Sequence, residues 1–364
     1  MKAKSPAQSN WTACLLILTA VLALMLYLPP SLQSQVKRVV YRPGPDDFKY
    51  TFGQHRPVMK IKPGTVIETL TEDCYDGRVK MPGDLPTKVI PPGHDNPQTG
   101  PFYIEGAEPG DTLVVHLLSL EPTRDYGISS YFPGFGILTP TKYTAMLNPP
   151  LPETVWWYRV DKEKGTVRFE ARQGNFSCEL PIKPFLGCLG VAPADNEART
   201  TVVPEAFGGN LDSPEVRPGH TIYLPVNVRG ALLFFGDGHL IQGDGEIIGT
   251  AVEAALKVEL YVDLVKNRKT DWPRIESDDY LMSLGSYRPL EDAFRIAHKD
   301  LLDWLMADYG LEMMDAYQLL SQVGEARVAQ VVDPNYTVVA RFPKKYLPPA
   351  RGETAHEKIR RLKF

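Results

Sequence analysis

FFGDGHLIQGDGEIIGTAVE, residues 234–253, joins an apolar segment to a dense group of acidic side chains. The apolar residues 231–235 predict a buried strand. Cation-binding residue types then alternate with glycines, at Asp237, His239, Asp244 and Glu246. Side chains two positions apart in an extended chain point to one side, so Asp237 and His239 are expected to face together. The same spacing predicts that Asp244 and Glu246 face together.

The glycines in this stretch permit positive φ angles and close backbone approach, so a tight turn can bring the two acidic arms together. Three carboxylates and an imidazole meeting at one point would hold a divalent cation through oxygen and nitrogen ligands. The alternative is a polar hairpin turn with solvated charges, because glycine and aspartate are common turn residues. The stretch alone leaves both interpretations open.

Alternation of apolar and polar residues continues directly after this stretch. Within residues 250–265, every second residue from Val252 to Leu264 is apolar, and Glu253 and Lys257 lie on the other face, which predicts a long antiparallel strand with one wet face. Residues 156–171 predict a hairpin around the turn sequence DKEKG. The 33 prolines and 29 glycines indicate many turns. We therefore expect a mainly β protein with an antiparallel sandwich or barrel-like core.

The C-terminal part has a different pattern. Apolar residues recur at helical spacing from Leu290 to Leu305, and Gly310 ends this helix. A second helix over 312–322 and strands over 325–332 and 336–342 complete a small α/β subdomain. The predicted organisation has five parts: an N-terminal signal segment (1–34), a β domain (35–190), a β domain with the acidic site (191–285), the α/β subdomain (286–350) and a loose basic tail (351–364).

The N-terminus has the pattern of a signal peptide or a signal anchor. Lys2 and Lys4 precede the uncharged residues 11–28, which Pro29 ends. The uncharged stretch is at the short limit for a membrane-spanning helix, so cleavage and membrane anchoring through residues 11–28 both remain open. We expect an exported protein, periplasmic or extracellular, or held at the membrane. In an oxidising compartment Cys178 and Cys188 either pair or remain small buried thiols.

Two further segments carry candidate site residues. His94 and Asp95 are adjacent on a loop framed by glycine and proline, and Asp212 follows a Gly-Gly pair. The alternative is that they are turn or cap residues. The formal net charge is −4 with acids and bases interspersed and no basic stripe, which argues against a nucleic-acid partner.

Several blocks of the sequence resemble the acetamidase/formamidase family, and they run from about Thr51 to Leu347. They are NPQTGPFYIEGAEPGDTL, GCLGVAPA, GGNLD, YLPVNVRGALLFFGDGHLIQGDGEIIGTAVE and ARFPKKYLP. The resemblance implies a mainly β architecture, hydrolysis of short amides to a carboxylate and ammonia, homo-oligomers, and a divalent cation, zinc or calcium, near the acidic block. Members of this family are mostly cytoplasmic, so the export segment is a departure from the pattern.

The motif match places six residues as candidate metal ligands: His94, Asp95, Asp212, Asp237, His239 and Asp244. Water activated by a metal can attack an amide carbon, and a carboxylate outside the coordination shell can carry its proton. Glu246 is the first candidate for this base and Glu253 the second. Cys74 is a poor nucleophile candidate because neighbouring aspartates raise a thiol pKa. The alternative function is an exported, cation-stabilised β-rich binding protein or an inactive family member.

The export hypothesis is tested by fusing residues 1–34 to a reporter enzyme that is active only outside the cytosol. We expect reporter activity, because the basic residues and the apolar stretch have the order of an export signal. The mass of the mature full-length protein then distinguishes cleavage from anchoring. An inactive reporter, with the fusion protein retained in the cytosol, would reject export.

Overall fold

The computed structural model describes residues 36–140 and 147–364. The segment interpreted as a signal peptide or signal anchor lies outside the described residues. Every helix within the described ranges is too short or too polar to span a bilayer. The residues from Lys37 to Leu362 form one compact unit.

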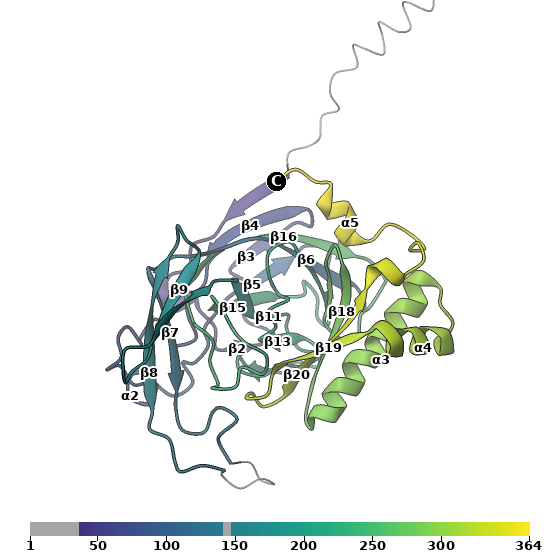
Figure 1. The fold of residues 1–364 in the computed structure, drawn as a ribbon. Helices are drawn as coiled ribbons and strands as arrows, with labels where there is room; N and C mark the ends of the chain where they lie inside the picture. The colour runs from purple at the N-terminus through teal and green to yellow at the C-terminus, as the bar shows by residue number, and fades with distance from the viewer. Residues whose placement is uncertain (1–35, 141–146) are drawn as a thin grey trace, which may run out of the picture. The chain divides into compact units, whose positions relative to one another are not determined.

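Four sheets make up most of this unit (Figure 1). The nine-stranded sheet has the order β1 (Lys37–Val40), β4 (Thr65–Leu70), β16 (Leu256–Val265), β6 (Thr112–Pro122), β14 (Thr221–Pro225), β17 (Arg274–Glu276), β18 (Tyr280–Tyr287), β20 (Tyr336–Pro343) and β19 (Glu325–Gln330). The five-stranded sheet has the order β13 (Gly208–Asn210), β11 (Phe185–Gly190), β15 (Leu233–His239), β5 (Gln98–Ile104) and β3 (Met59–Ile61).

The smaller sheets and the helices lie around these two. The four-stranded sheet has the order β10 (Ser177–Pro181), β9 (Thr166–Glu170), β8 (Thr154–Asp161) and β7 (Tyr126–Tyr131), and β12 (Arg199–Thr200) pairs with β2 (Thr51–Phe52). The helices are α2 (Pro86–Val89), α3 (Leu290–Tyr309), α4 (Met313–Val323) and α5 (Ala355–Arg360), with 3-10 turns at η1 (Pro45–Asp47) and η2 (Lys344–Tyr346). The predicted hairpin is confirmed, because β8 and β9 pair antiparallel across their turn.

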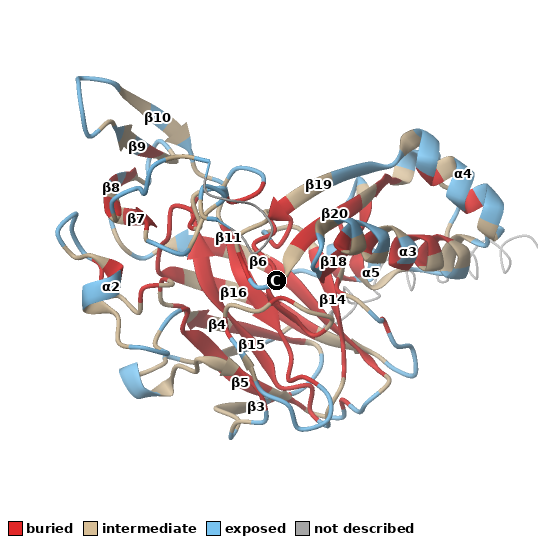
Figure 2. Ribbon diagram, turned by 90° about the horizontal axis from the view of Figure 1, so that it is seen from below, coloured by how far each residue is buried: buried red, intermediate tan, exposed pale blue. Residues whose placement is uncertain are grey.

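The two large sheets share one hydrophobic core. Ile67, Leu113 and Leu260 of the nine-stranded sheet belong to the same buried cluster as Phe102 and Phe235 of the five-stranded sheet. Figure 2 shows these central strands buried, whereas β9, β10 and α4 carry most of their residues at least partly exposed. The named strand pairings are antiparallel apart from β1 with β4 and β3 with β5. The predicted mainly β, antiparallel sandwich core is therefore confirmed.

The C-terminal helices and strands also follow the sequence pattern. Helix α3 is C-capped by Gly310, whose φ of 71° is in the left-handed region. Strands β18, β19 and β20 continue the nine-stranded sheet, and α3 packs on β18 and β20 (Figure 1). That sheet draws strands from each of the three regions predicted as separate domains.

Two local predictions are wrong. The basic tail is not loose throughout, because Thr354 and Glu357 form a capping box and α5 buries His356 and Ile359. The long alternating strand begins at Leu256 rather than at residue 250. Glu253 is buried instead of lying on a wet face, since it makes only isolated bridges to neighbouring strands and turns into the interior.

Close contact between β18 and α3 depends on Gly285. A Cβ atom at this position would lie 2.6 Å from the Ala297 backbone nitrogen and also against the Ala293 carbonyl. We expect Gly285→Ala to lower the free energy of unfolding by about 1–3 kcal/mol, the usual cost of overpacking. Urea unfolding measures the difference. Gly83→Ala is the matched control, because Gly83 has open space around it and no positive φ. Equal stability of both variants would contradict the close-packing argument.

Candidate functional site

Strand β15 brings the first two residues of the acidic block into the protein interior. It lies between β11 and β5, and it ends with Asp237 and His239. Asp237 Oδ1 lies 3.2 Å from His239 Nε2, and both side chains are almost fully buried. The two residues face the same point, as their spacing predicts.

Two more carboxyl groups reach the same imidazole nitrogen. Glu253 Oε2 lies 3.1 Å and Asp212 Oδ1 lies 4.0 Å from His239 Nε2. Across the described chain, these two oxygens and Asp237 Oδ1 are buried and have no partner in good hydrogen-bond geometry. Three carboxylate oxygens therefore converge on one ring nitrogen.

The orientation of His239 is set by Gln242. The Gln242 amide nitrogen donates to the backbone carbonyls of Asp212, at 2.8 Å, and Ala329, at 3.1 Å, so its oxygen faces His239 Nδ1 at 3.0 Å. Because this oxygen is an acceptor, Nδ1 carries a hydrogen, and Nε2 faces the carboxylates, where it either holds a proton or offers its lone pair to a cation. Such an arrangement of acceptors fits a cation or a proton.

The electrostatics of the cluster agree with this geometry. Burial and the neighbouring carboxylate of Asp333 raise the pKa of Asp212, and burial and Asp212 raise the pKa of Glu246. Burial disfavours a charge on His239, but Glu253 and Asp237 outweigh it and raise the pKa of the ring. The cluster contains more carboxyl groups than cationic groups. A divalent cation would neutralise the excess negative charge.

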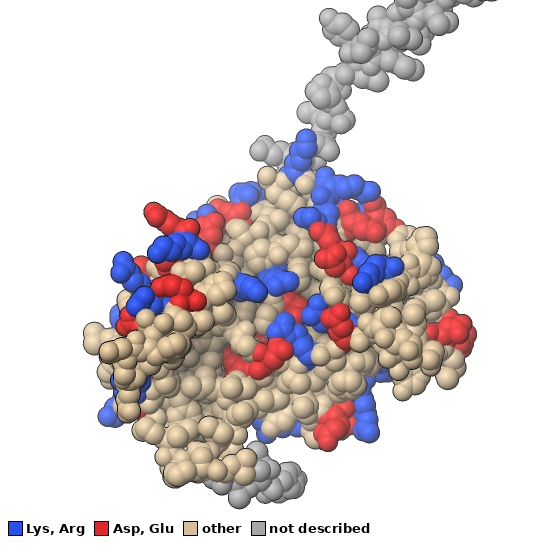
Figure 3. All heavy atoms as spheres, viewed as in Figure 1, with Lys and Arg blue, Asp and Glu red and all other residues tan. Residues whose placement is uncertain are grey.

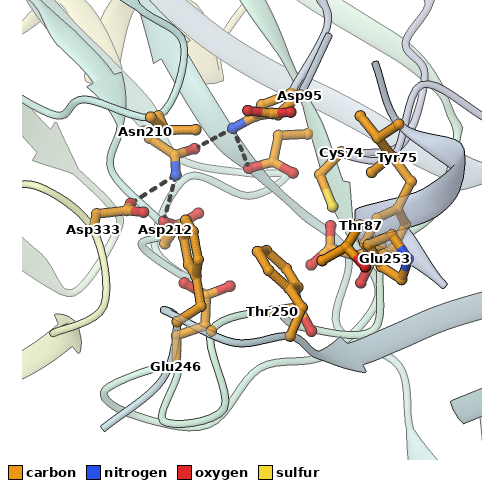
Figure 4. Close-up of a pocket in the computed structure, with 18 of the residues that line it drawn as sticks. Cys74, Tyr75, Thr87, Asp95, Asn210, Asp212, Glu246, Thr250, Glu253 and Asp333 are labelled. Atoms are coloured by element: carbon orange, nitrogen blue, oxygen red, sulfur yellow. Dashed lines mark hydrogen bonds between the residues drawn. The ribbon is translucent and has the colours of Figure 1, made fainter. Parts of the chain in front are cut away.

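An asparagine connects the cluster to the C-terminal part of the chain (Figure 4). Asn210 donates from its amide nitrogen to Asp212 Oδ2 at 3.0 Å and to Asp333 Oδ2 at 2.7 Å. Asn96 donates in turn to Asn210 Oδ1 at 2.9 Å. Sequence reasoning missed Asp333 and Asn96. Asn96 directly follows the predicted pair at 94–95, whereas Asp333 sits in an ordinary-looking Asp-Pro turn and gave no signal.

Part of the backbone strain of the chain lies at the site. Four of the ten described non-glycine residues with positive φ belong to it: Asn96 (58°), Asp212 (43°), Asp237 (58°) and Glu246 (47°). Each such conformation costs on the order of 1–3 kcal/mol and persists where the surroundings fix it. The surrounding structure therefore holds these four residues in conformations that they would not adopt on their own.

Gly187 on β11 provides the space in which the carboxylates sit. A Cβ atom there would lie 2.6 Å from Asp212 Oδ1 and would also meet the Asp237 carboxylate. Only glycine at position 187 leaves room for the carboxylates of Asp212 and Asp237 to approach each other. The sequence blocks around residues 187, 212 and 237 are thus parts of one site.

The structure does not bring all predicted ligands to the cluster. The His94 ring packs at a tilt against Tyr50, with ring centroids 4.6 Å apart, and lies 3.9 Å from Asp76, away from the cavity. Asp244 is exposed and accepts a hydrogen bond from Arg327 at 2.7 Å. Asp244 and Glu246 diverge because they lie in a turn in which residues 245 and 246 have positive φ, not in an extended strand.

Asp95, Glu246 and Glu253 line a cavity of about 220 Å³ together with the convergent cluster (Figure 4). Burial raises the pKa of Asp95, which stays more exposed than the others. Cys74 also lines the cavity, and burial with the nearby Glu253 raises the pKa of its thiol. Its position does not favour a thiolate nucleophile.

Two other cysteines lie within the described residues. Cys178 lies on β10 and Cys188 on β11, and both are free thiols. The Cys188 sulfur donates to Asn210 Oδ1 at 2.7 Å, so it packs inside the site's hydrogen-bond network. The alternative of a Cys178–Cys188 disulfide is not realised in the structure.

These features together define a β-sandwich protein with a cavity that ends in buried carboxylates around one imidazole. The chain belongs to the acetamidase/formamidase family, whose model matches residues 54–196 and 187–347. This agrees with the resemblance of the sequence blocks.

Individual relatives support the assignment. The chain is 28% identical over 260 residues to an acetamidase of Mycolicibacterium smegmatis, covering 57% of this chain and 63% of that protein. It is 29% identical over 215 residues to a formamidase of Methylophilus methylotrophus, covering 46% and 51%. The chain thus spans about half to two thirds of the length of these curated relatives.

Solved structures match over a larger part. The crystal structure of an acetamidase from Yersinia enterocolitica has a TM-score of 0.79 and 41% identity, and the match covers 88% of this chain and 98% of that one. An acetamidase from Bacillus halodurans has a TM-score of 0.75 and 29% identity, with coverages of 85% and 98%. The fold is therefore that of the solved family members.

Proposed function

We propose that this protein hydrolyses a short-chain linear amide, of the acetamide or formamide type, to a carboxylate and ammonia. The observation that carries the proposal is the convergence of Asp212, Asp237 and Glu253 on His239 beside the cavity. Membership of the family supports it, because relatives with this fold are an acetamidase and a formamidase.

The convergent cluster is the proposed site of a divalent cation. Two nitrogen or oxygen ligands of a tetrahedral zinc ion lie about 3.3 Å apart, and the oxygens lie 3.1 to 4.0 Å from His239 Nε2. The unpartnered buried oxygens and the lone pair of His239 fit such an ion. The imidazole ligand favours zinc over calcium, which prefers oxygen ligands alone. When bound, a divalent cation lowers the pKa of water and polarises a carbonyl group.

Glu246 is the proposed general base. Its carboxyl group is buried beside the cluster and lines the cavity, and burial with the neighbouring Asp212 raises its pKa. Its carboxylate takes a proton from the attacking water as the oxygen–carbon bond forms. It then gives this proton to the amide nitrogen, the carbon–nitrogen bond breaks, and ammonia leaves. Backbone bonds from Gly245 to β19 at 2.9 and 3.1 Å hold the turn that carries Glu246.

The alternative function is a cation-stabilised binding protein or an inactive family member. The strained backbone and buried acidic cluster would serve either role, but the buried carboxyl group of Glu246, which lines the cavity beside the cluster, favours catalysis. Ammonia release from a panel of small amides separates the two, since a binding protein releases none.

The cation proposal predicts coupled losses of metal and stability. We expect Asp237→Ala combined with His239→Ala to lower both bound metal, measured by elemental analysis, and the melting temperature. The reason is that a ligand bound only by the folded state stabilises that state. The matched control is His94→Ala combined with Asp244→Ala, two residues that the structure places away from the cluster. Unchanged metal in the first variant, or equal loss in both, would refute the assignment.

The role of Glu246 is tested by Glu246→Gln, which keeps size and hydrogen bonding but removes basicity. We expect kcat for amide hydrolysis to fall by on the order of 10²- to 10⁴-fold, with metal content unchanged. Asp244→Asn in the same turn is the control and should retain activity. Loss of metal together with activity would instead make Glu246 a ligand. A loss within a few fold would reject it as the base.

A further inference from the structure

The cavity has a second side that the acidic cluster does not explain. This second side is apolar. It is lined by Pro86, Ile90, Pro91, Phe132, Phe135 and Val202. They come from three separate segments: α2 with the loop after it, the loop after β7, and the segment after β12. An apolar lining of this kind supplies neither a ligand for a cation nor a group that carries a proton.

The cavity is also larger than the smallest amides require. Water takes up about 30 Å³ per molecule, so 220 Å³ has room for roughly seven waters, whereas acetamide displaces about three. Acetamide held at the carboxylates would leave the apolar side in contact with water. That arrangement forgoes the favourable burial of apolar surface on binding.

The apolar side is fixed in relation to the proposed base. The rings of Phe132 and Phe135 pack with centroids 4.6 Å apart. The next turn of this loop bonds to the segment that follows Glu246, with Ile137 nitrogen donating to the Ile247 carbonyl at 2.9 Å. A Cβ atom at Gly249 would lie 2.9 Å from Phe135 Cβ, so the two segments touch. The aromatic pair and Glu246 are therefore held in one arrangement.

The opposite part of the apolar side is anchored as well. The Ile90 nitrogen donates to the Pro86 carbonyl at 3.0 Å, which closes the short helix α2. The Thr87 nitrogen donates to Glu153 Oε1 at 2.9 Å, which ties this helix to the residues just before β8. The loop that carries Phe132 and Phe135 and the helix α2 are thus both held in place by hydrogen bonds.

We propose that the substrate is a primary amide whose acyl group is apolar and larger than acetyl, such as a linear chain of four to six carbons or an aryl group. This inference rests on the proposed function and specifies its substrate class. The nitrogen of a primary amide carries no substituent, so only the acyl group can reach the apolar side when the carbonyl carbon lies at the carboxylates. Phe132, Phe135 and Ile90 then determine acyl specificity.

The test is a series of primary amides: formamide, acetamide, butanamide, hexanamide and benzamide. Each buried methylene is worth about fourfold in affinity, so we expect kcat/KM to rise at least about tenfold from acetamide to hexanamide. Ammonia release measures the rate. Phe135→Ala should lower the ratio of kcat/KM for hexanamide to kcat/KM for acetamide by about tenfold. Phe135→Leu, which retains an apolar side chain, should give an intermediate loss.

Leu138→Ala is the matched control, because Leu138 lies on the same loop but is exposed and does not line the cavity. It should leave the whole series unchanged. If acetamide and formamide are hydrolysed as efficiently as hexanamide, or if Phe135→Ala slows every amide equally, the acyl-pocket inference falls while the proposed function stands. If no amide in the series releases ammonia, the proposed function itself fails and the inference falls with it.

Discussion

The accumulation of buried carboxyl groups around His239 is the constraint on which the rest of the site depends. Asp212, Asp237 and Glu253 are each almost fully buried, and the cost of desolvating such groups is recovered only through a counter-charge or hydrogen bonds. Asn210 and backbone amides supply part of the hydrogen bonding. The remaining carboxylate oxygens face the ring nitrogen of His239. The fold therefore brings together three carboxyl groups and only one imidazole.

This constraint explains features that lie far from one another in the sequence. Gly187 lacks a side chain because the carboxylates occupy that volume, and the positive φ angles at Asp212, Asp237 and Glu246 turn their side chains inward. Strong secondary structure surrounds the site, so a rigid sandwich holds the strain in place. On the face seen in Figure 3, by contrast, basic and acidic side chains are interspersed, and no patch of one sign stands out.

Much of the fold could be predicted from the sequence because its signals are local. Alternation, turn residues and helical spacing depend on neighbours within a few positions, and they located the β8–β9 hairpin, α3 and the strands after it. The pairing of Asp237 with His239 followed from the same period of two. The divergence of Asp244 and Glu246 did not, because a turn with positive φ at Gly245 has no such period.

Other residues of the site could not be found from sequence pattern. Asp333 reaches Asn210 only because β19 lies at the edge of the nine-stranded sheet and its following turn folds over the acidic block. A contact between residues so far apart in the sequence produces no periodic pattern in that sequence. His94 shows the converse, since it is adjacent to cavity-lining Asp95 yet its side chain lies against Tyr50. Their adjacency in the sequence predicted that both side chains belong to the site, but the loop directs them to different places.

The Asn96–Asn210–Asp333 connection also sets an order of events during synthesis of the chain. Asn96 is synthesised long before Asp333, and Asn210 lies between them in the sequence. No nascent chain that stops before β19 contains the complete network, so a long loop must close between its first and last members before the network forms. The hydrogen bonds through which Asn210 holds Asp212 beside Asp333 are therefore complete only after β19 and the turn that follows it have emerged.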